Sequence, residues 1–278
     1  MKKQVFVIFV CLVCSVSVSL AQSYNEWIEK ADEYIKAEDW EKAETALLSA
    51  LKTEPANAQN GLLLSNLGTV QRYCGKYNEA LQSYSLALFM SPRSIAVLRN
   101  RAALYAEMDS LHKALEDYSS LLLLDDTDED ALYNRSLIYL EQGDTIGCRN
   151  DLEKMLTINP ASSTARIGFA VFFKAQGYYT EAIEMYNQVI RHNPGNASLY
   201  IGRAETHLLA GHPSSADRDI EKALKLDPQN PFIYMLRAWV KVERSDESAA
   251  ARDIEYAKAL GYDAKACDAF FEEIKKKK

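Results

Sequence analysis

The sequence predicts an all-α protein, a right-handed superhelical solenoid built from about seven copies of one helix-turn-helix unit. Three observations predict this fold. Small, aromatic and proline residues recur in a 34-residue frame, glycine follows the first half of several copies, and no stretch alternates apolar and polar residues as a strand would. One pair of helices cannot bury its apolar face alone, so neighbouring copies must stack to form the core.

Residues 1–21 have the features of a signal peptide ahead of the solenoid. Two lysines at positions 2 and 3 precede an apolar run over 5–20, and Ser19-Leu20-Ala21 places small residues where a signal peptidase cleaves. The run has about 16 residues, fewer than the roughly 20 that cross a bilayer. We therefore expect cleavage before Gln22 rather than an uncleaved anchor. The mature chain is expected to be exported, either periplasmic or secreted, with no stable membrane span.

The repeat is clearest in residues 61–94, and the same register extends in both directions. The seven copies, which form the predicted domain 22–264, span 24–57, 61–94, 95–128, 129–162, 163–196, 197–230 and 231–264. Position 8 of the frame carries only small residues, namely Ala31, Gly68, Ala102, Ser136, Ala170, Ala204 and Ala238. Position 20 is equally small, with alanine in six copies and Cys148 in the fourth. Antiparallel helices approach closely only where such residues meet, so helix A (about positions 2–14) crosses helix B (about 18–29) there.

Turn and proline residues predict where the helices end. Gly75, Gly143, Gly177 and Gly211 supply a residue that tolerates positive φ after helix A. Proline at position 32 stops helix B in five copies. Asp126 and Tyr262 occupy that position in the third and seventh copies, so those two junctions lack the fixed stop.

Two segments fall outside the regular frame. Residues 58–60 are inserted between the first and second copies and are expected to form a longer turn or an added helical turn. Residues 265–278 place Cys267, Phe270, Phe271 and Ile274 at helical spacing, with charges between them and a basic tail at the end. This spacing predicts a helix that caps the last copy.

The frame resembles the tetratricopeptide repeat family over residues 24–264. The resemblance implies a binding scaffold in which helix A lines a concave groove with positions 2, 5, 6, 9, 12 and 13. Position 6 reads Asn66, Asn100 and Asn134 in three successive copies, similar to the asparagine ladder of peptide-binding members. An amide both donates and accepts hydrogen bonds, so such a ladder suits an extended peptide backbone. The family's clamp for acidic C-terminal tails is absent, because Ile28 and Asp32 stand at its first two positions.

Apolar side chains occupy the groove positions of the last three copies. They are Ile167, Val171, Ile201, Leu208, Leu209, Met235 and Trp239. Such residues on a solvated groove indicate that something covers them, either a partner segment or the capping helix. We hypothesise that an amphipathic or apolar peptide docks there with Trp239 as its anchor.

Four arginines recur at position 7, a packing position in the family. Arg101, Arg135, Arg203 and Arg237 are therefore expected to bond within the solenoid rather than to a ligand. His207 stands at position 11, otherwise often aromatic, and is expected to pack.

Composition and motifs argue against other function classes. The formal charge is −7, and it becomes −9 when residues 1–21 and their two lysines are removed, so nucleic acid is not an expected partner. No two of the four histidines have the i, i+4 spacing of a metal pair, and the sequence contains no phosphate loop, nucleophile elbow or CxxC pair. We expect no enzyme activity, catalytic residue, metal or cofactor.

Cysteines and two turns bear on the predicted compartment. Cys74, Cys148 and Cys267 are odd in number and far apart, so we expect them to be unpaired. Asp109-Ser110-Leu111 and Asp144-Thr145-Ile146 resemble O-glycan acceptors of some Gram-negative envelopes. The favoured interpretation is that these Asp, Ser and Thr residues cap helix B.

The function indicated is a protein-protein interaction scaffold or adaptor of the bacterial cell envelope, with a peptide or protein partner in the groove. Two alternatives stay open at this point. One is a glycan-binding or envelope-glycan-processing protein, and the other is a self-associating structural solenoid. The sequence identifies neither the partner nor the oligomeric state.

Overall fold

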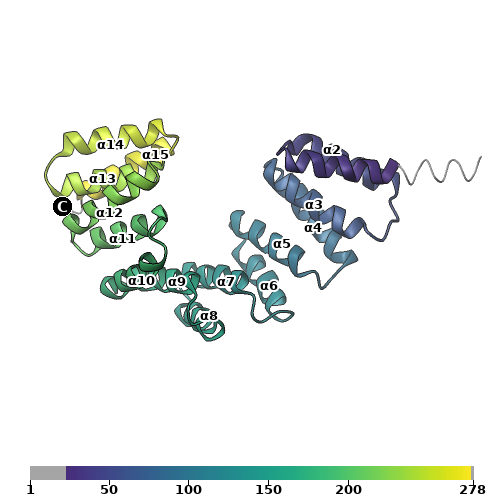
Figure 1. Cartoon of the computed structure of the whole chain (residues 1–278), viewed down its shortest axis with the longest axis horizontal. Coiled ribbons are helices and arrows are strands. Elements are labelled where there is room, and N and C mark those ends of the chain that lie inside the picture. Colours follow the sequence, from purple (N-terminus) through teal and green to yellow (C-terminus); the bar gives the residue numbers. More distant parts are fainter. Residues whose placement is uncertain (1–22, 277–278) are drawn as a thin grey trace, which may run out of the picture. The chain divides into compact units, whose positions relative to one another are not determined.

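A computed structural model describes residues 23–276, which divide into two compact units, unit 1 (23–138) and unit 2 (139–276) (Figure 1). Residues 23–36 are helical, and the following helices are α2 (Trp40–Thr53), α3 (Asn60–Tyr73), α4 (Tyr77–Met90), α5 (Ile95–Glu107), α6 (Leu111–Leu122), α7 (Glu129–Glu141), α8 (Thr145–Ile158), α9 (Ser163–Ala175), α10 (Tyr179–His192), α11 (Ala197–Leu209), α12 (Pro213–Leu226), α13 (Pro231–Glu243), α14 (Glu247–Ala259) and α15 (Ala264–Lys276). Residues 23–276 contain no strand. The predicted all-α repeat fold is confirmed.

Each unit is assembled from helix A and helix B pairs that stack on one another. Within copies, α3 packs on α4 and α5 on α6 in unit 1, while α9 packs on α10, α11 on α12 and α13 on α14 in unit 2. Between copies, α2 contacts α3 and α4 contacts α5 in unit 1, and α10 contacts α11 and α12 contacts α13 in unit 2.

The small residues of the frame lie where helices A and B cross. A Cβ atom added to Gly68 on α3 would lie 2.7 Å from the Tyr84 ring on α4, closer than side chains normally approach. Tyr84 itself is fully buried, as are Ala80 and Ala102. The close approach predicted from the frame is therefore present, with a bulky position 24 residue filling the space that the small residue leaves.

Every turn after helix A uses positive φ at position 15 of the frame. The four glycines named above have φ of 72–78°, as expected for a residue with no Cβ atom. In the remaining three copies Glu38, Asp109 and Ser245 adopt φ of 56°, 56° and 66°. The fold thus requires this backbone conformation whether or not a glycine is available.

Two junctions depart from the regular frame. At the insertion, α3 begins at Asn60, whose buried side chain accepts a hydrogen bond from Tyr24 and donates one to the Glu54 carbonyl. The third copy lacks proline at position 32, yet α6 ends at Leu122, two positions earlier in the frame than α4. Asp125 closes that turn by accepting hydrogen bonds from the backbone and hydroxyl of Thr127.

The predicted capping helix is α15, which begins at Ala264 and packs on α13 and α14. On α15 itself, Cys267 and Ile274 are fully buried, and Phe270 and Phe271 are half-buried. In the continued frame α15 takes the place of an eighth helix A, but its position 8 is the exposed Glu272 rather than a small residue. A helix B could not approach α15 as closely as it does the A helices with a small residue at this position.

None of the helices within residues 23–276 is both long enough and apolar enough to cross a membrane. The predicted signal peptide lies outside the described residues.

Candidate functional site

The proposed asparagine ladder lies on successive A helices of unit 1. Asn66 on α3 and Asn100 on α5 are half-buried, and neither side chain hydrogen-bonds to another residue within 23–276. Asn134 on α7 differs, because its amide nitrogen donates to the Asp130 carbonyl at 2.8 Å. Two of the three predicted amides thus keep their hydrogen-bonding capacity available to a ligand, and the ladder itself stays a prediction.

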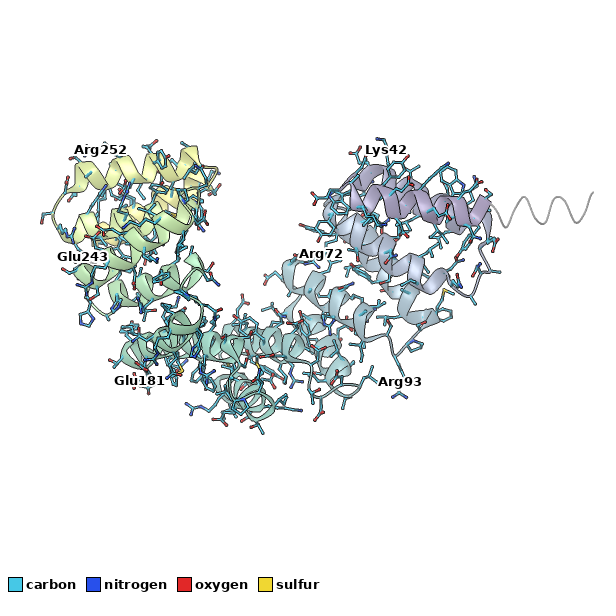
Figure 2. The ribbon with its side chains drawn as sticks, in the orientation of Figure 1. Lys42, Arg72, Arg93, Glu181, Glu243 and Arg252 are labelled. Carbon is cyan, nitrogen blue, oxygen red and sulfur yellow. The ribbon has the colours of Figure 1, made fainter. Side chains whose placement is uncertain are left out.

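A charged pair lies beside these asparagines. Arg72, labelled in Figure 2, donates from Nε to Glu107 at 2.8 Å and makes a second, shorter contact to the other carboxylate oxygen. Seven residues are nearly two helical turns, so Glu107 shares a face of α5 with Asn100. This pair joins helix α3 to helix α5, and it makes the A-helix face of unit 1 polar.

An aromatic pocket adjoins the same face of unit 1. The rings of Trp40 and Tyr73 stack with centroids 4.4 Å apart, and they line a pocket of about 570 Å³ together with Glu38 and Cys74. Tyr73 is seven residues from Asn66, and 64% of its surface is exposed. Sequence reasoning did not single out this pair, although Tyr73 occupies position 13, one of the groove positions of the frame.

The apolar groove positions of unit 2 are largely used in packing. Leu208, Met235 and Trp239 are buried, while Ile167, Ile201 and Leu209 are half-buried against the same core and Val171 is half-buried. Trp239 is only 6% exposed, and its ring meets Phe270 of α15 edge to face at 6.0 Å. The capping helix therefore covers Trp239, and a peptide would reach this side chain only if α15 moved away.

The arginines at position 7 bond within the solenoid, as predicted. Arg101 pairs with Asp117 through two hydrogen bonds of 2.8 Å, and Arg203 pairs with Asp219 at 2.8 and 2.6 Å. The same side chains reach the preceding copy, since Arg203 also donates to Asn187 at 2.6 Å. The sequence also contains the partner of each arginine, which the sequence analysis did not identify. Every copy with Arg at position 7 has Asp at position 23, sixteen residues later.

Comparison with known proteins agrees with these observations. Models of the tetratricopeptide repeat match residues 28–95, 129–162 and 173–240. A tetratricopeptide repeat protein of Parabacteroides merdae, known from its crystal structure, is 36% identical with a TM-score of 0.83, and the match covers 91% of this chain and 99% of that one. This chain belongs to the tetratricopeptide repeat family.

More distant tetratricopeptide-like structures share the fold only. Pseudomonas aeruginosa PilF is 18% identical with a TM-score of 0.60, covering 79% of this chain and 99% of its own. PilW, a type IV pilus biogenesis factor, is 18% identical with a TM-score of 0.63, covering 73% and 94%. No curated protein matches the sequence significantly. The tetratricopeptide fold generally serves as a scaffold for protein interactions.

Cys148, Cys267 and His207 of this tetratricopeptide repeat protein are held in packing roles. Cys74, Cys148 and Cys267 are free thiols, as predicted, and burial raises the pKa of Cys148 to about 11. Burial also lowers the pKa of His207, whose Nδ1 is buried without a hydrogen-bond partner among the described residues. No group of His, Cys, Asp and Glu side chains within 23–276 is arranged to hold a metal ion.

The two candidate glycosylation turns precede helices B of their copies. Asp144 caps α8 by accepting a hydrogen bond from the Gly147 backbone at 2.8 Å. Ser110 occupies the cap position of α6 without such a side-chain bond. The capping interpretation is thus confirmed for Asp144, and modification of Ser110 or Thr145 stays a prediction.

Proposed function

We propose that this protein is a non-catalytic scaffold of the bacterial cell envelope that binds an extended peptide segment along the A-helix face of unit 1. The observation that carries the proposal is that the side-chain amides of Asn66 and Asn100, at equivalent positions of successive A helices, make no hydrogen bond to another described residue. An extended strand alternates donors and acceptors along its backbone, and side-chain amides match both. Export to the envelope is supported by the signal-like residues 1–21.

The aromatic pocket supplies the second element of recognition. Tyr73 lies on the same face of α3 as Asn66, nearly two turns away, so a bound segment that crosses the amides reaches the Trp40–Tyr73 rings. Aromatic rings bind apolar or cationic side chains by burial and by attraction to the ring face. The carboxylate of Glu38 in the pocket lining adds negative charge. We therefore expect the segment to carry an apolar or basic side chain at this point.

The test is affinity capture from envelope extract, with variants that remove the amides. We expect Asn66→Ala combined with Asn100→Ala to lose the partner captured by the wild-type chain. Tyr73→Ser should weaken capture less severely. Asn78→Ala combined with Asn150→Ala is the matched control, because both asparagines are exposed on B helices. Retention of the same partner by the folded double variant would contradict the proposed site.

A further inference from the structure

The Trp40–Tyr73 pocket lies between the turns that join helix A to helix B in the first two copies. Residues 37–41 line it from the first copy, and Tyr73, Cys74 and Lys76 line it from the second. Stacking uses one face of each ring, and Tyr73 keeps 64% of its surface exposed. A bound group can therefore lie against an aromatic surface in this pocket of unit 1.

The repeat frame does not require two aromatic residues at this junction. Trp40 stands at position 17 of the first copy, and Tyr73 stands at position 13 of the second. At the following junctions the same two positions are Tyr77 with Glu107, Leu111 with Glu141, Thr145 with Ala175, Tyr179 with Leu209 and Pro213 with Glu243. The aromatic pair is thus particular to the first junction, which favours a role in binding over a role in the fold.

The pocket carries negative charge that the ion pairs around it do not neutralise. Its lining contains the carboxylates of Glu38, Asp39 and Glu41 and the ammonium group of Lys76. The ion pairs are Asp39 with Lys42, which Figure 2 labels, and Lys76 with Glu44, both at 2.6 Å. Glu38 and Glu41 make no ion pair with another described residue. Two carboxylates beside the aromatic rings are therefore available to a bound cation.

A cation suits this pocket better than an apolar side chain does. An apolar occupant would take Glu38 and Glu41 partly out of water without compensation. A cation over the exposed ring face is attracted both by the ring and by the two carboxylates. We propose that the pocket binds a cationic side chain of the peptide segment that the A-helix face takes up. This inference rests on the proposed function and narrows the apolar or basic residue expected there to a basic one.

Titration with N-acetyl-arginine methylamide, followed by NMR at the indole N–H of Trp40, tests the pocket without the rest of a peptide. The guanidinium is planar, so it can stack on a ring while its N–H groups donate to a carboxylate. N-acetyl-citrulline methylamide is the matched neutral probe, because it keeps the shape and lacks the charge. At equal ionic strength we expect the arginine probe to bind about fivefold more tightly than the citrulline probe. Trp40→Phe identifies the signal among the three tryptophans.

Two results of this titration would overturn the proposal. One is equal affinity for the arginine and citrulline probes, which would show that the pocket does not recognise charge. The other is a Trp40 signal that does not move with the arginine probe up to about 0.1 M, which would show that the rings bind no cation.

Removal of the two carboxylates tests their part in the selection. Glu38→Gln with Glu41→Gln should lower the preference for arginine over citrulline at least about twofold, because the attraction to the carboxylates is lost. Glu153→Gln with Glu221→Gln is the matched control, since it removes the same charge from exposed B-helix positions of unit 2. Thermal melting of each variant verifies its fold. An unchanged preference in the folded Glu38 and Glu41 variant would overturn the proposal.

Removal of the exposed ring tests the aromatic contribution. Tyr73→Ser should weaken binding of the arginine probe about fivefold, because the cation loses the ring face. Tyr178→Ser is the matched control, because Tyr178 is similarly exposed but lies in unit 2. Equal binding by Tyr73→Ser and the wild type would contradict a site on these rings.

Asn66→Ala with Asn100→Ala separates this inference from the proposed function. These amides do not line the pocket, so the double variant should bind the arginine probe like the wild type. If this variant loses its partner while the wild type does not distinguish the two probes, the cation site is wrong and the peptide site stands. If the wild type distinguishes the probes while the double variant retains its partner, the cation site stands and the proposed peptide site is wrong.

Discussion

Unit 1 and unit 2 hold their successive copies together in different ways. In unit 2, the residue at position 4 hydrogen-bonds back to the carbonyl of the preceding proline at position 32. Arg166 donates to Pro160 at 2.7 Å, Tyr200 to Pro194 at 3.1 Å and Tyr234 to Pro228 at 2.8 Å. In the second, third and fourth copies the same position is occupied by leucine, whose side chain cannot make such a bond.

Charged side chains join successive copies in both units, as Lys174 and Glu205 do at 2.6 Å between the fifth and sixth copies of unit 2. Arg72 bonds to Glu107 between α3 and α5, and Lys76 pairs with Glu44 at 2.6 Å between the first and second copies. The A-helix face of unit 1 therefore stays polar and accessible. In unit 2 several of the corresponding positions are apolar and Trp239 packs against the cap, although Lys174 and Glu205 also occupy groove positions. The proposed recognition site thus lies in unit 1, whereas the last copy of unit 2 packs against the capping helix.

The largest expected effect comes from removing the anchor of the cap. Trp239→Ala should lower the free energy of unfolding of unit 2 by about 3–5 kcal/mol, because a buried aromatic is replaced by a cavity beneath α15. Trp40→Ala in unit 1 removes only a half-buried stacked ring and should cost about 1 kcal/mol. Hydrogen exchange followed separately in each unit measures both. If the Trp239→Ala variant kept the stability of unit 2 but no longer captured a partner, Trp239 would instead be a ligand anchor.

The buried ion pairs give the next largest effect, and here the two units should respond alike. Asp219→Ala in unit 2 and Asp117→Ala in unit 1 each leave a largely buried guanidinium without its carboxylate, which should cost about 3 kcal/mol. The fifth copy shows a natural apolar replacement, with Phe169 and Met185 at the two positions.

Transplanting that apolar pair is the control for the ion-pair prediction. Arg203→Phe with Asp219→Met should unfold within about 1.5 kcal/mol of the wild type, because an apolar pair of similar volume avoids the cost of burying two charges. Urea denaturation measures both variants. If the double variant were as unstable as Asp219→Ala, the Arg203–Asp219 pair would stabilise the fold by itself, beyond cancelling the cost of burying each charge.

The sequence predicted the framework better than the surface, for a physical reason. Close crossings at Gly68 and buried bulk at Tyr84 recur with the repeat period, so a single register determines them. The sequence left open whether a partner segment or the capping helix covers the groove of unit 2, because position alone does not show that Phe270 lies against Trp239. The Trp40–Tyr73 pocket depends on how two neighbouring turns meet, and no periodic pattern encodes that contact.

The smallest expected effect concerns the turns after helix A, where the units differ in how many copies lack glycine. Two of the three residues that hold positive φ at position 15 without being glycine, Glu38 and Asp109, lie in unit 1, and Ser245 lies in unit 2. A side chain in this conformation brings its Cβ atom close to the backbone, a strain that glycine avoids. Glu38→Gly should therefore stabilise unit 1 by about 0.5–1 kcal/mol, with Asp109→Gly smaller because aspartate tolerates this conformation better.

Gly75→Ala supplies the reverse substitution at the same position of the second copy. Its φ is 72°, and a Cβ atom would meet no other atom within 4 Å, so steric contact with other residues is absent and the backbone alone determines the outcome. We expect a loss of about 1 kcal/mol, measured by urea denaturation beside Glu38→Gly. A gain in stability for Glu38→Gly and a loss for Gly75→Ala would show that position 15 favours glycine in both copies. A Glu38→Gly variant that is less stable than the wild type would show that the Glu38 side chain contributes more than its backbone strain costs.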